Sequence, residues 1–192
     1  MRGLKYMAVC LVLAACGGGN DDAGEVSRMV PGEIPDLRWG HLPQGSAWTS
    51  ATLDAINSHG QALTQLVPRD TETWCPGYEG QSREGRAAFW AGLLSTLSKH
   101  ESTWNPRAVG GGGKWYGLLQ ILPATARGYK CTAPSRAALK TGAANLSCGI
   151  RILAVTVPRD QVIAYKDNKW RGVAADWGPM RSSKKRAEMS AW

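Results

Sequence analysis

The chain has 192 residues, a formal net charge of +8 and 20 % charged residues. This length allows one domain with a hydrophobic core plus a leader or linker. The positive charge would suit a polyanionic partner, or serve solubility alone. The sequence contains no nucleic-acid-binding motif, so we predict no nucleic acid partner.

Residues 1–15 are predicted to be a lipoprotein signal peptide. The basic start Met1–Lys5 precedes an apolar run, Met7–Ala15, that is too short to span a membrane. The string Leu13-Ala14-Ala15-Cys16 resembles a bacterial lipobox, in which Cys16 would be lipidated. The alternative is an ordinary signal peptide with a chance cysteine. By resemblance to Gram-negative lipoproteins, Gly17 in place of an Asp favours a periplasm-facing lipoprotein of the outer membrane, held by this lipid anchor.

Residues 16–45 are expected to form the lipidated cysteine and a flexible tether. The segment contains Gly17-Gly18-Gly19-Asn20-Asp21-Asp22 and then three prolines, with little hydrophobic periodicity. The folded domain is accordingly expected to cover residues 46–192.

The hydrophobic pattern of this domain predicts a mainly α fold with little or no sheet. A first helix is expected to start at Ser46 and to be weakened by Gly60, with an apolar face made of Leu53, Ile56, Leu63 and Leu66. Further helices are expected over Arg83–His100, Pro123–Tyr129 and Asn145–Val155, with two short ones over Val162–Tyr165 and Arg171–Trp177. No alternating strand pattern of useful length is present.

Glu101 is the strongest candidate for a catalytic residue. It falls four residues after Leu97, on the apolar face of the predicted helix, and Pro106 soon ends that helix. Desolvation raises the pKa of a carboxyl, and the negative end of the helix dipole raises it further. A carboxyl that keeps its proton near neutral pH can act as the general acid in glycoside cleavage.

The segment that follows Glu101 offers it no second carboxylate. From Ser102 to Arg159 there is no Asp or Glu, although Arg107, Lys114, Arg127, Lys130, Arg136, Lys140, Arg151 and Arg159 all fall there. Most glycosidases use a pair of carboxylates. Asp160, Asp167 and Asp176 could approach only by folding back, so a single acid suggests that the substrate itself participates.

Tryptophan is abundant, with nine Trp against one Phe, and Trp and Tyr suit sugar stacking as well as half-exposed packing. Packing is the favoured reading for any single Trp; the better candidates for sugar contacts are Trp104, Trp115, Tyr116 and Trp177. We predict no metal site, because the histidines lack Cys or acidic neighbours at metal spacing. We predict no cofactor: Lys114 of the Gly-rich run precedes Trp115 rather than Ser or Thr, unlike a phosphate-binding loop.

Among the cysteines, Cys131 and Cys148 are expected to form a disulfide. An exported chain meets an oxidising compartment, and closing this short loop would contribute on the order of 3 kcal/mol. Cys75 would then be buried and inert or able to pair elsewhere.

Several motifs, in order, resemble the catalytic domain of soluble lytic transglycosylases, which share the goose-type lysozyme fold. The motifs are Glu101-Ser102-x-x-Asn105-Pro106, Gly117-Leu118-Leu119-Gln120-Ile121, Pro123-Ala124-Thr125-Ala126 and Asn145-Leu146. The resemblance runs from about Ser46 to Trp192. It implies a lysozyme-like domain that binds peptidoglycan glycan strands. It also implies cleavage of the bond between N-acetylmuramic acid and N-acetylglucosamine, with a 1,6-anhydro end as product.

The resemblance also implies roles for individual residues. Glu101 would be the acid and then the base, and the substrate-binding residues would be Ser102, Tyr116, Gly117, Gln120, Asn145 and Trp177. Asp176 stands where the family often has a Tyr near the acid, and Tyr129 and Tyr165 are the candidates to substitute for that Tyr. A hydrolytic lysozyme on the same fold and a non-catalytic wall-binding scaffold are the alternatives, and the sequence does not identify the protein partners.

Overall fold

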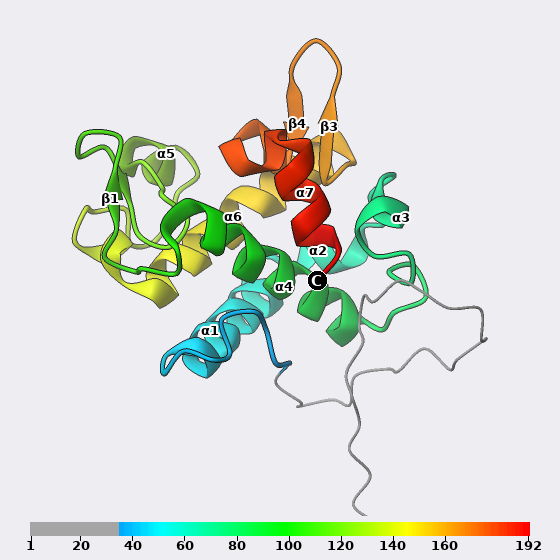
Figure 1. The fold of residues 1–192 in the computed structure, drawn as a ribbon, viewed down its shortest axis with the longest axis horizontal. Coiled ribbons are helices and arrows are strands. Elements are labelled where there is room, and N and C mark those ends of the chain that lie inside the picture. The colour runs from blue at the N-terminus through cyan, green and yellow to red at the C-terminus, as the bar shows by residue number, and fades with distance from the viewer. Residues whose placement is uncertain (1–34) are drawn as a thin grey trace, which may run out of the picture.

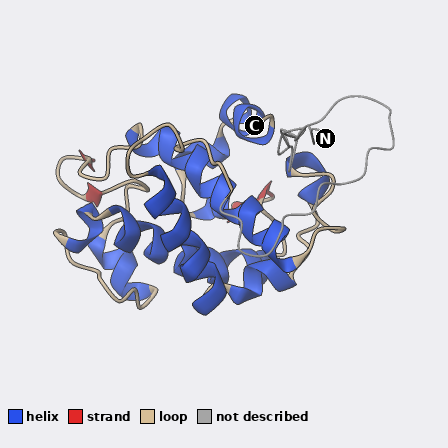
Figure 2. Cartoon of the chain, turned by 90° about the horizontal axis from the view of Figure 1, so that it is seen from below, coloured by secondary structure: helices blue, strands red, loops and turns tan. Residues whose placement is uncertain are grey.

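The computed structural model describes residues 35–192 of the chain (Figure 1). The predicted signal peptide, the lipidation site Cys16 and most of the predicted tether lie outside the described residues. Within the described part, helices dominate and the strands are short (Figure 2). The mainly α prediction is therefore confirmed.

The α-helices are α1 (Gly45–Ser58), α2 (Gln61–Gln65), α3 (Thr71–Trp74), α4 (Arg83–Ser102), α5 (Pro123–Gly128), α6 (Gly142–Asp160) and α7 (Ser183–Ser190). Three short 3-10 helices are η1 (Ala138–Lys140), η2 (Val173–Ala175) and η3 (Gly178–Arg181). The strands form two antiparallel hairpins, β1 (Val109–Gly110) with β2 (Trp115–Tyr116) and β3 (Ala164–Lys166) with β4 (Trp170–Gly172).

Helix α4 passes through the middle of the fold and packs against α1, α2 and α7 (Figure 1). The Ser82 side chain caps its first turn by accepting a hydrogen bond from the Gly85 N–H. Its buried side chains include Trp90, Leu94 and Leu97, so the stripe read from the sequence faces the core. The helix ends where Thr103 adopts a left-handed conformation, three residues before Pro106.

The ordered domain begins earlier than the sequence pattern indicated. Residues 35–45, predicted to belong to the tether, pack on the helices, and Leu37 and Trp39 are buried. The Trp39 indole donates a hydrogen bond to Thr49 Oγ1 at 2.9 Å, and its backbone N–H donates to Ser95 Oγ at 3.1 Å. The predicted tether boundary at residue 45 is therefore wrong: a buried indole whose polar groups are satisfied is part of the core.

Two helix predictions also need correction. The predicted first helix is two helices that part near Gly60, where an added Cβ would lie 2.5 Å from Ile150 on α6. The short helices expected over Val162–Tyr165 and Arg171–Trp177 are instead the β3–β4 hairpin followed by η2. The Asp167 carboxylate accepts a hydrogen bond from the Lys169 N–H at 2.9 Å, which favours a turn at this point.

The predicted disulfide between Cys131 and Cys148 is present and joins the loop after α5 to α6. Cys75 is buried, with 1 % of its surface exposed, and has an interaction partner of its own. Among residues 35–192 no helix has both the length and the apolar character needed to cross a membrane.

Candidate active site

Glu101 lies in the last turn of α4, at the end of the buried stripe. Burial raises the pKa of its carboxyl to about 7, and the positive charge of Lys185 on α7 opposes that rise. The expectation of a carboxyl that holds its proton near neutral pH is thus confirmed. At neutral pH the group is divided between the acid and the carboxylate, which suits a residue that must both give and take a proton.

An ionic cluster fixes α7 against the end of α4. The Glu188 carboxylate accepts hydrogen bonds from Arg38, at 2.7 Å, and from Lys99, and lies 3.3 Å from His100 Nε2. The hydrogen bond from Lys99 contributes most, and together these contacts lower the pKa of Glu188 to about 2. Lys185 is one helical turn before Glu188 and so lies on the same side of α7. The cluster thereby holds the Lys185 charge near Glu101.

Ser102 connects the end of α4 to the segment Gly117–Gln120. Its hydroxyl lies 2.9 Å from the carbonyl oxygen of Leu118, to which it donates, and 3.2 Å from that of Ser98. Ser102 is only partly buried, and its position in the chain places it beside the acid. Its clearest role in the fold is to fix the distance between the end of α4 and this segment.

Asn145 holds the same segment from the other side and is not a substrate contact. Its side chain is 0 % exposed, so the predicted direct role in substrate binding is wrong. Asn145 Oδ1 accepts from the Leu119 N–H at 2.8 Å, and Nδ2 donates to the carbonyls of Tyr116 and Leu139, both at 2.9 Å. The side chain thus satisfies three backbone groups, and it positions the loop from the start of α6.

Two aromatic residues predicted to contact sugar are also buried. Tyr116 is 5 % exposed and donates its hydroxyl to the Gly113 carbonyl at 2.5 Å, while Trp177 is 4 % exposed and donates to the Leu119 carbonyl at 2.9 Å. Both predictions of direct substrate contact are therefore corrected to positioning roles. Trp104 is half-buried, whereas Trp115 is 46 % exposed and is the candidate that offers its ring to a ligand.

Gly117 and Gln120 adopt left-handed backbone conformations with φ of +79° and +49°. A Cβ at Gly117 would overlap the Leu139 carbonyl and the Asn145 amide, and the residue is buried. Glycine is required here by packing, so the predicted role of Gly117 in substrate binding is corrected to a packing role. The Gln120 side chain donates to the Gly117 carbonyl at 2.9 Å and remains partly exposed, so a contact between Gln120 and glycan is still a prediction.

The carboxylates that follow Arg159 in the chain interact with arginines. Asp160 pairs with Arg159 at 2.7 Å, and Asp167 pairs with Arg171 at 2.9 Å. Desolvation raises the pKa of Asp176, while the charges of Arg159 and Arg181 lower it. Within residues 35–192, the charge that acts on Glu101 is that of Lys185 and not a second carboxylate.

Neither proposed tyrosine replaces the family residue near the acid. Tyr129 interacts with Arg159 and Asp176, and burial raises its pKa, whereas Tyr165 on β3 is exposed. Among the described residues neither forms a hydrogen bond with Glu101.

Sequence reasoning also missed Lys185 and Glu188, since a short basic run near the end of the chain does not reveal which helix it packs against.

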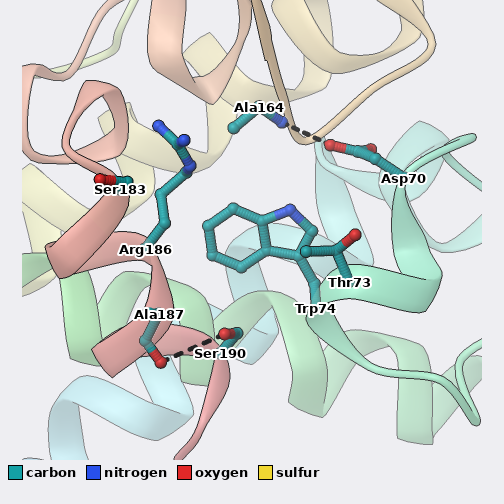
Figure 3. A pocket seen from close by; sticks show the side chains of 8 residues that line it. All are labelled: Asp70, Thr73, Trp74, Ala164, Ser183, Arg186, Ala187 and Ser190. Carbon is teal, nitrogen blue, oxygen red and sulfur yellow. Dashed lines mark hydrogen bonds between the residues drawn. The ribbon is translucent and has the colours of Figure 1, made fainter.

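A separate pocket of about 370 Å³ lies between α3, β3 and α7. Figure 3 shows the Trp74 indole between Arg186 and Asp70, whose carboxylate accepts hydrogen bonds from the N–H groups of Ile163 and Ala164. Glu101 does not line this pocket. The part of the chain that the structure describes holds no group of three or more His, Cys, Asp or Glu that could bind a metal ion.

A mainly helical domain with one proton-holding glutamate at the end of its central helix has the character of a lysozyme-like, glycan-cleaving protein. The transglycosylase SLT domain family model matches residues 81–175. The chain belongs to this family, whose members are lytic transglycosylases that act on peptidoglycan.

Solved structures agree with this assignment. The wild-type form of Bd0314 DslA and a glutamate-to-glutamine mutant are each 30 % identical, cover 81 % of this chain and 93 % of their own, and superpose with a TM-score of 0.75. A second such mutant is 29 % identical over 83 % of this chain and 95 % of its own, with a TM-score of 0.75. No curated protein sequence matches the chain.

Proposed function

We propose that this protein is a peptidoglycan lytic transglycosylase that cleaves the β-1,4 bond between N-acetylmuramic acid and N-acetylglucosamine and leaves a 1,6-anhydro end. The observation that carries the proposal is the environment of Glu101. Burial raises its pKa to about 7, and the charge that acts on it is a lysine. A lone acid of this kind fits a reaction in which the substrate supplies its own nucleophile.

In the first step, protonated Glu101 gives its proton to the glycosidic oxygen. The bond between C1 of the muramoyl residue and that oxygen breaks, and the N-acetylglucosamine side leaves as an alcohol. The N-acetyl group of the muramoyl residue stabilises the positive charge that develops at C1. The Glu101 carboxylate formed here gains from the positive charge of Lys185, which lowers its pKa.

In the second step, the 6-hydroxyl of the same muramoyl residue attacks C1. The Glu101 carboxylate accepts the hydroxyl proton, so the enzyme returns to its starting protonation state and no water is consumed. The fixed segment Gly117–Gln120, held by Ser102 and Asn145, gives the sugar a constant position relative to the acid.

Mass spectrometry of digested sacculi tests this proposal. Wild-type protein is expected to release anhydro-muropeptides, and Glu101→Gln is expected to release none above background. Glu79→Gln, which changes an exposed glutamate outside the site, is the matched control and should behave as wild type. Products heavier by one water would show a hydrolase instead, and binding without turnover by the wild type would show a scaffold.

We also propose that the protein is a periplasm-facing lipoprotein of the outer membrane. The support is the sequence of residues 1–17, with an apolar leader, a lipobox ending in Cys16, and no Asp after it. Full-length protein should carry label from radioactive palmitate and fractionate with the outer membrane. Cys16→Ser should lose both properties, and inner-membrane fractionation of the wild type would contradict the sorting.

A further inference from the structure

A basic pocket of about 280 Å³ lies in the lobe that contains β1, β2 and α5 (Figure 1). Three segments meet there: the β1–β2 turn, helix α5 with the residue before it, and the loop before η1. Its lining residues are Gly113, Lys114, Leu122, Pro123, Ala124, Arg127, Ser135 and Arg136. One cation comes from each of the three segments.

The charges around this pocket are not balanced within the fold. In the part of the chain that the structure describes, Lys114, Arg127 and Arg136 take part in no ion pair. The sequence from Ser102 to Arg159 contains no acidic residue that could neutralise them. Cations that face one hollow without a counter-charge attract an anion from outside.

The walls of the pocket are held by specific contacts. The Tyr116 hydroxyl donates to the Gly113 carbonyl at 2.5 Å and fixes the β1–β2 turn. The disulfide of Cys131 ties the loop after α5 to α6, and Ser135 Oγ accepts a hydrogen bond from the Ala138 N–H at 3.1 Å. These contacts reduce the entropy that a ligand would have to remove when it binds.

The pocket lies on the same segment of chain that is fixed to the catalytic helix. Ser102 is bonded to Leu118, and four residues later Leu122 forms part of the pocket wall. A glycan strand that runs from Glu101 along this segment would carry its substituents to this lobe.

We propose that this pocket binds carboxylates of the peptide stems that peptidoglycan carries, an inference that rests on the proposed function. The sugar rings of the strand are uncharged, whereas the stem peptides end in and contain free carboxylates. Two arginines offer planar pairs of donors that match a carboxylate, and Lys114 adds a third charge. The site would select strands that still bear their peptides over bare glycan.

The test measures binding to soluble glycan strands in a Glu101→Gln background, which does not turn the strands over. One set of strands keeps its stem carboxylates, and a second set has them converted to amides. The pocket variant is K114Q/R127Q/R136Q, and the control variant is K166Q/K169Q/R83Q, which removes the same charge from exposed positions elsewhere.

The pocket variant is expected to bind carboxylate strands roughly tenfold more weakly than the control variant does. On amidated strands the two variants should bind alike, with thermal melts confirming that both are folded. The inference would be overturned if both variants bound the carboxylate strands equally weakly. It would also be overturned if the protein with an intact pocket bound amidated strands as tightly as carboxylate strands. Because binding is read without turnover, failure of the wild type to cleave would reject the proposed function separately.

Discussion

Asn145 Oδ1 accepts a hydrogen bond from the backbone N–H of Leu119 at 2.8 Å, which joins α6 to a segment 26 residues earlier in the chain. Ser102 reaches the neighbouring Leu118 carbonyl from the other side, at 2.9 Å. The loop next to Glu101 is therefore fixed by side chains from two helices that are far apart in sequence. A motif that resembles a substrate-binding signature serves here to position the backbone.

Asn145→Ala is expected to destabilise the fold strongly. Removing the side chain takes the side-chain partner from the buried Leu119 N–H and from the Leu139 carbonyl, and leaves the Tyr116 carbonyl with only its bond from the Ile121 N–H, at a cost of about 2 to 4 kcal/mol in the free energy of unfolding. Urea denaturation measures this cost. Asn57→Ala, at an exposed position on α1, is the control and should change stability by less than about 0.5 kcal/mol. A cost for Asn145→Ala below about 1 kcal/mol would contradict the positioning role.

A pair of glycine substitutions separates backbone strain from steric overlap. Gly117 and Gly112 both have positive φ, of +79° and +63°, but only at Gly117 would a Cβ overlap neighbours, and at Gly112 the space is open. Gly112→Ala should cost about 1 kcal/mol from conformation alone. Gly117→Ala should cost at least about 3 kcal/mol, because the Asn145 network must move as well. Equal costs in thermal or urea unfolding would show that packing at Gly117 does not matter.

Lys185→Met is expected to change the pH dependence of cleavage. The Lys185 charge lowers the pKa of Glu101, so its loss raises that pKa. Glu101 then stays protonated to higher pH, and the alkaline limb of the activity profile should shift to higher pH. The plateau rate should fall roughly two- to tenfold, since the carboxylate formed in the first step loses its counter-charge.

The measurement is the rate of anhydro-muropeptide release across pH for wild type, Lys185→Met and Lys184→Met. Lys184 is exposed and is the matched control, so its loss should leave the limb in place. An unchanged limb in Lys185→Met would show that Lys185 does not act on the acid.

Glu101→Gln is expected to stabilise the protein at alkaline pH. Burial raises the pKa of Glu101 from 4.5 to about 7 in the folded chain, so the unfolded chain releases this proton first as pH rises. The resulting cost is absent below the unfolded pKa, grows between the two values and reaches about 3 kcal/mol above them. The variant should therefore unfold at a higher temperature than wild type at about pH 8, and at a temperature similar to wild type at about pH 4.

Differential scanning calorimetry at the two pH values gives the comparison. Glu79→Gln, which changes an exposed glutamate outside the site, is the matched control. A stabilisation of Glu101→Gln that is equal at both values would mean that the carboxyl titrates normally.

The position of Glu101 could be predicted because its cause is local. The apolar stripe that ends at Leu97 and the proline at Pro106 both lie within a few residues of it. Trp39 could not be placed, since it follows a Pro- and Gly-rich stretch without periodicity and is held by Thr49 and Ser95 of two different helices. Long-range partners of that kind leave no pattern in the surrounding sequence.

The residues of the candidate site also divide into those that the sequence could mark and those that only long-range packing brings into place. The motifs marked Asn145 and Trp177, but a motif does not state whether a side chain faces the ligand or the backbone behind it. Both side chains turned out to bond carbonyl or amide groups of the loop. Lys185 and Glu188 carry no motif, and only the packing of α7 on α4 brings Lys185 to the acid and Glu188 to Lys99.

The Glu188 cluster has a practical consequence for anyone who trims this protein to its family segment. Arg38 and Glu188 both lie outside residues 81–175, yet Glu188 pairs with Arg38 and with Lys99, which is two positions before the acid. A fragment cut at the family borders would keep the glutamate and still lose Lys185, whose charge opposes the rise in the pKa of that glutamate, together with Glu188, which fixes α7 on α4. Such a fragment would report on a different acid from the one in the whole domain.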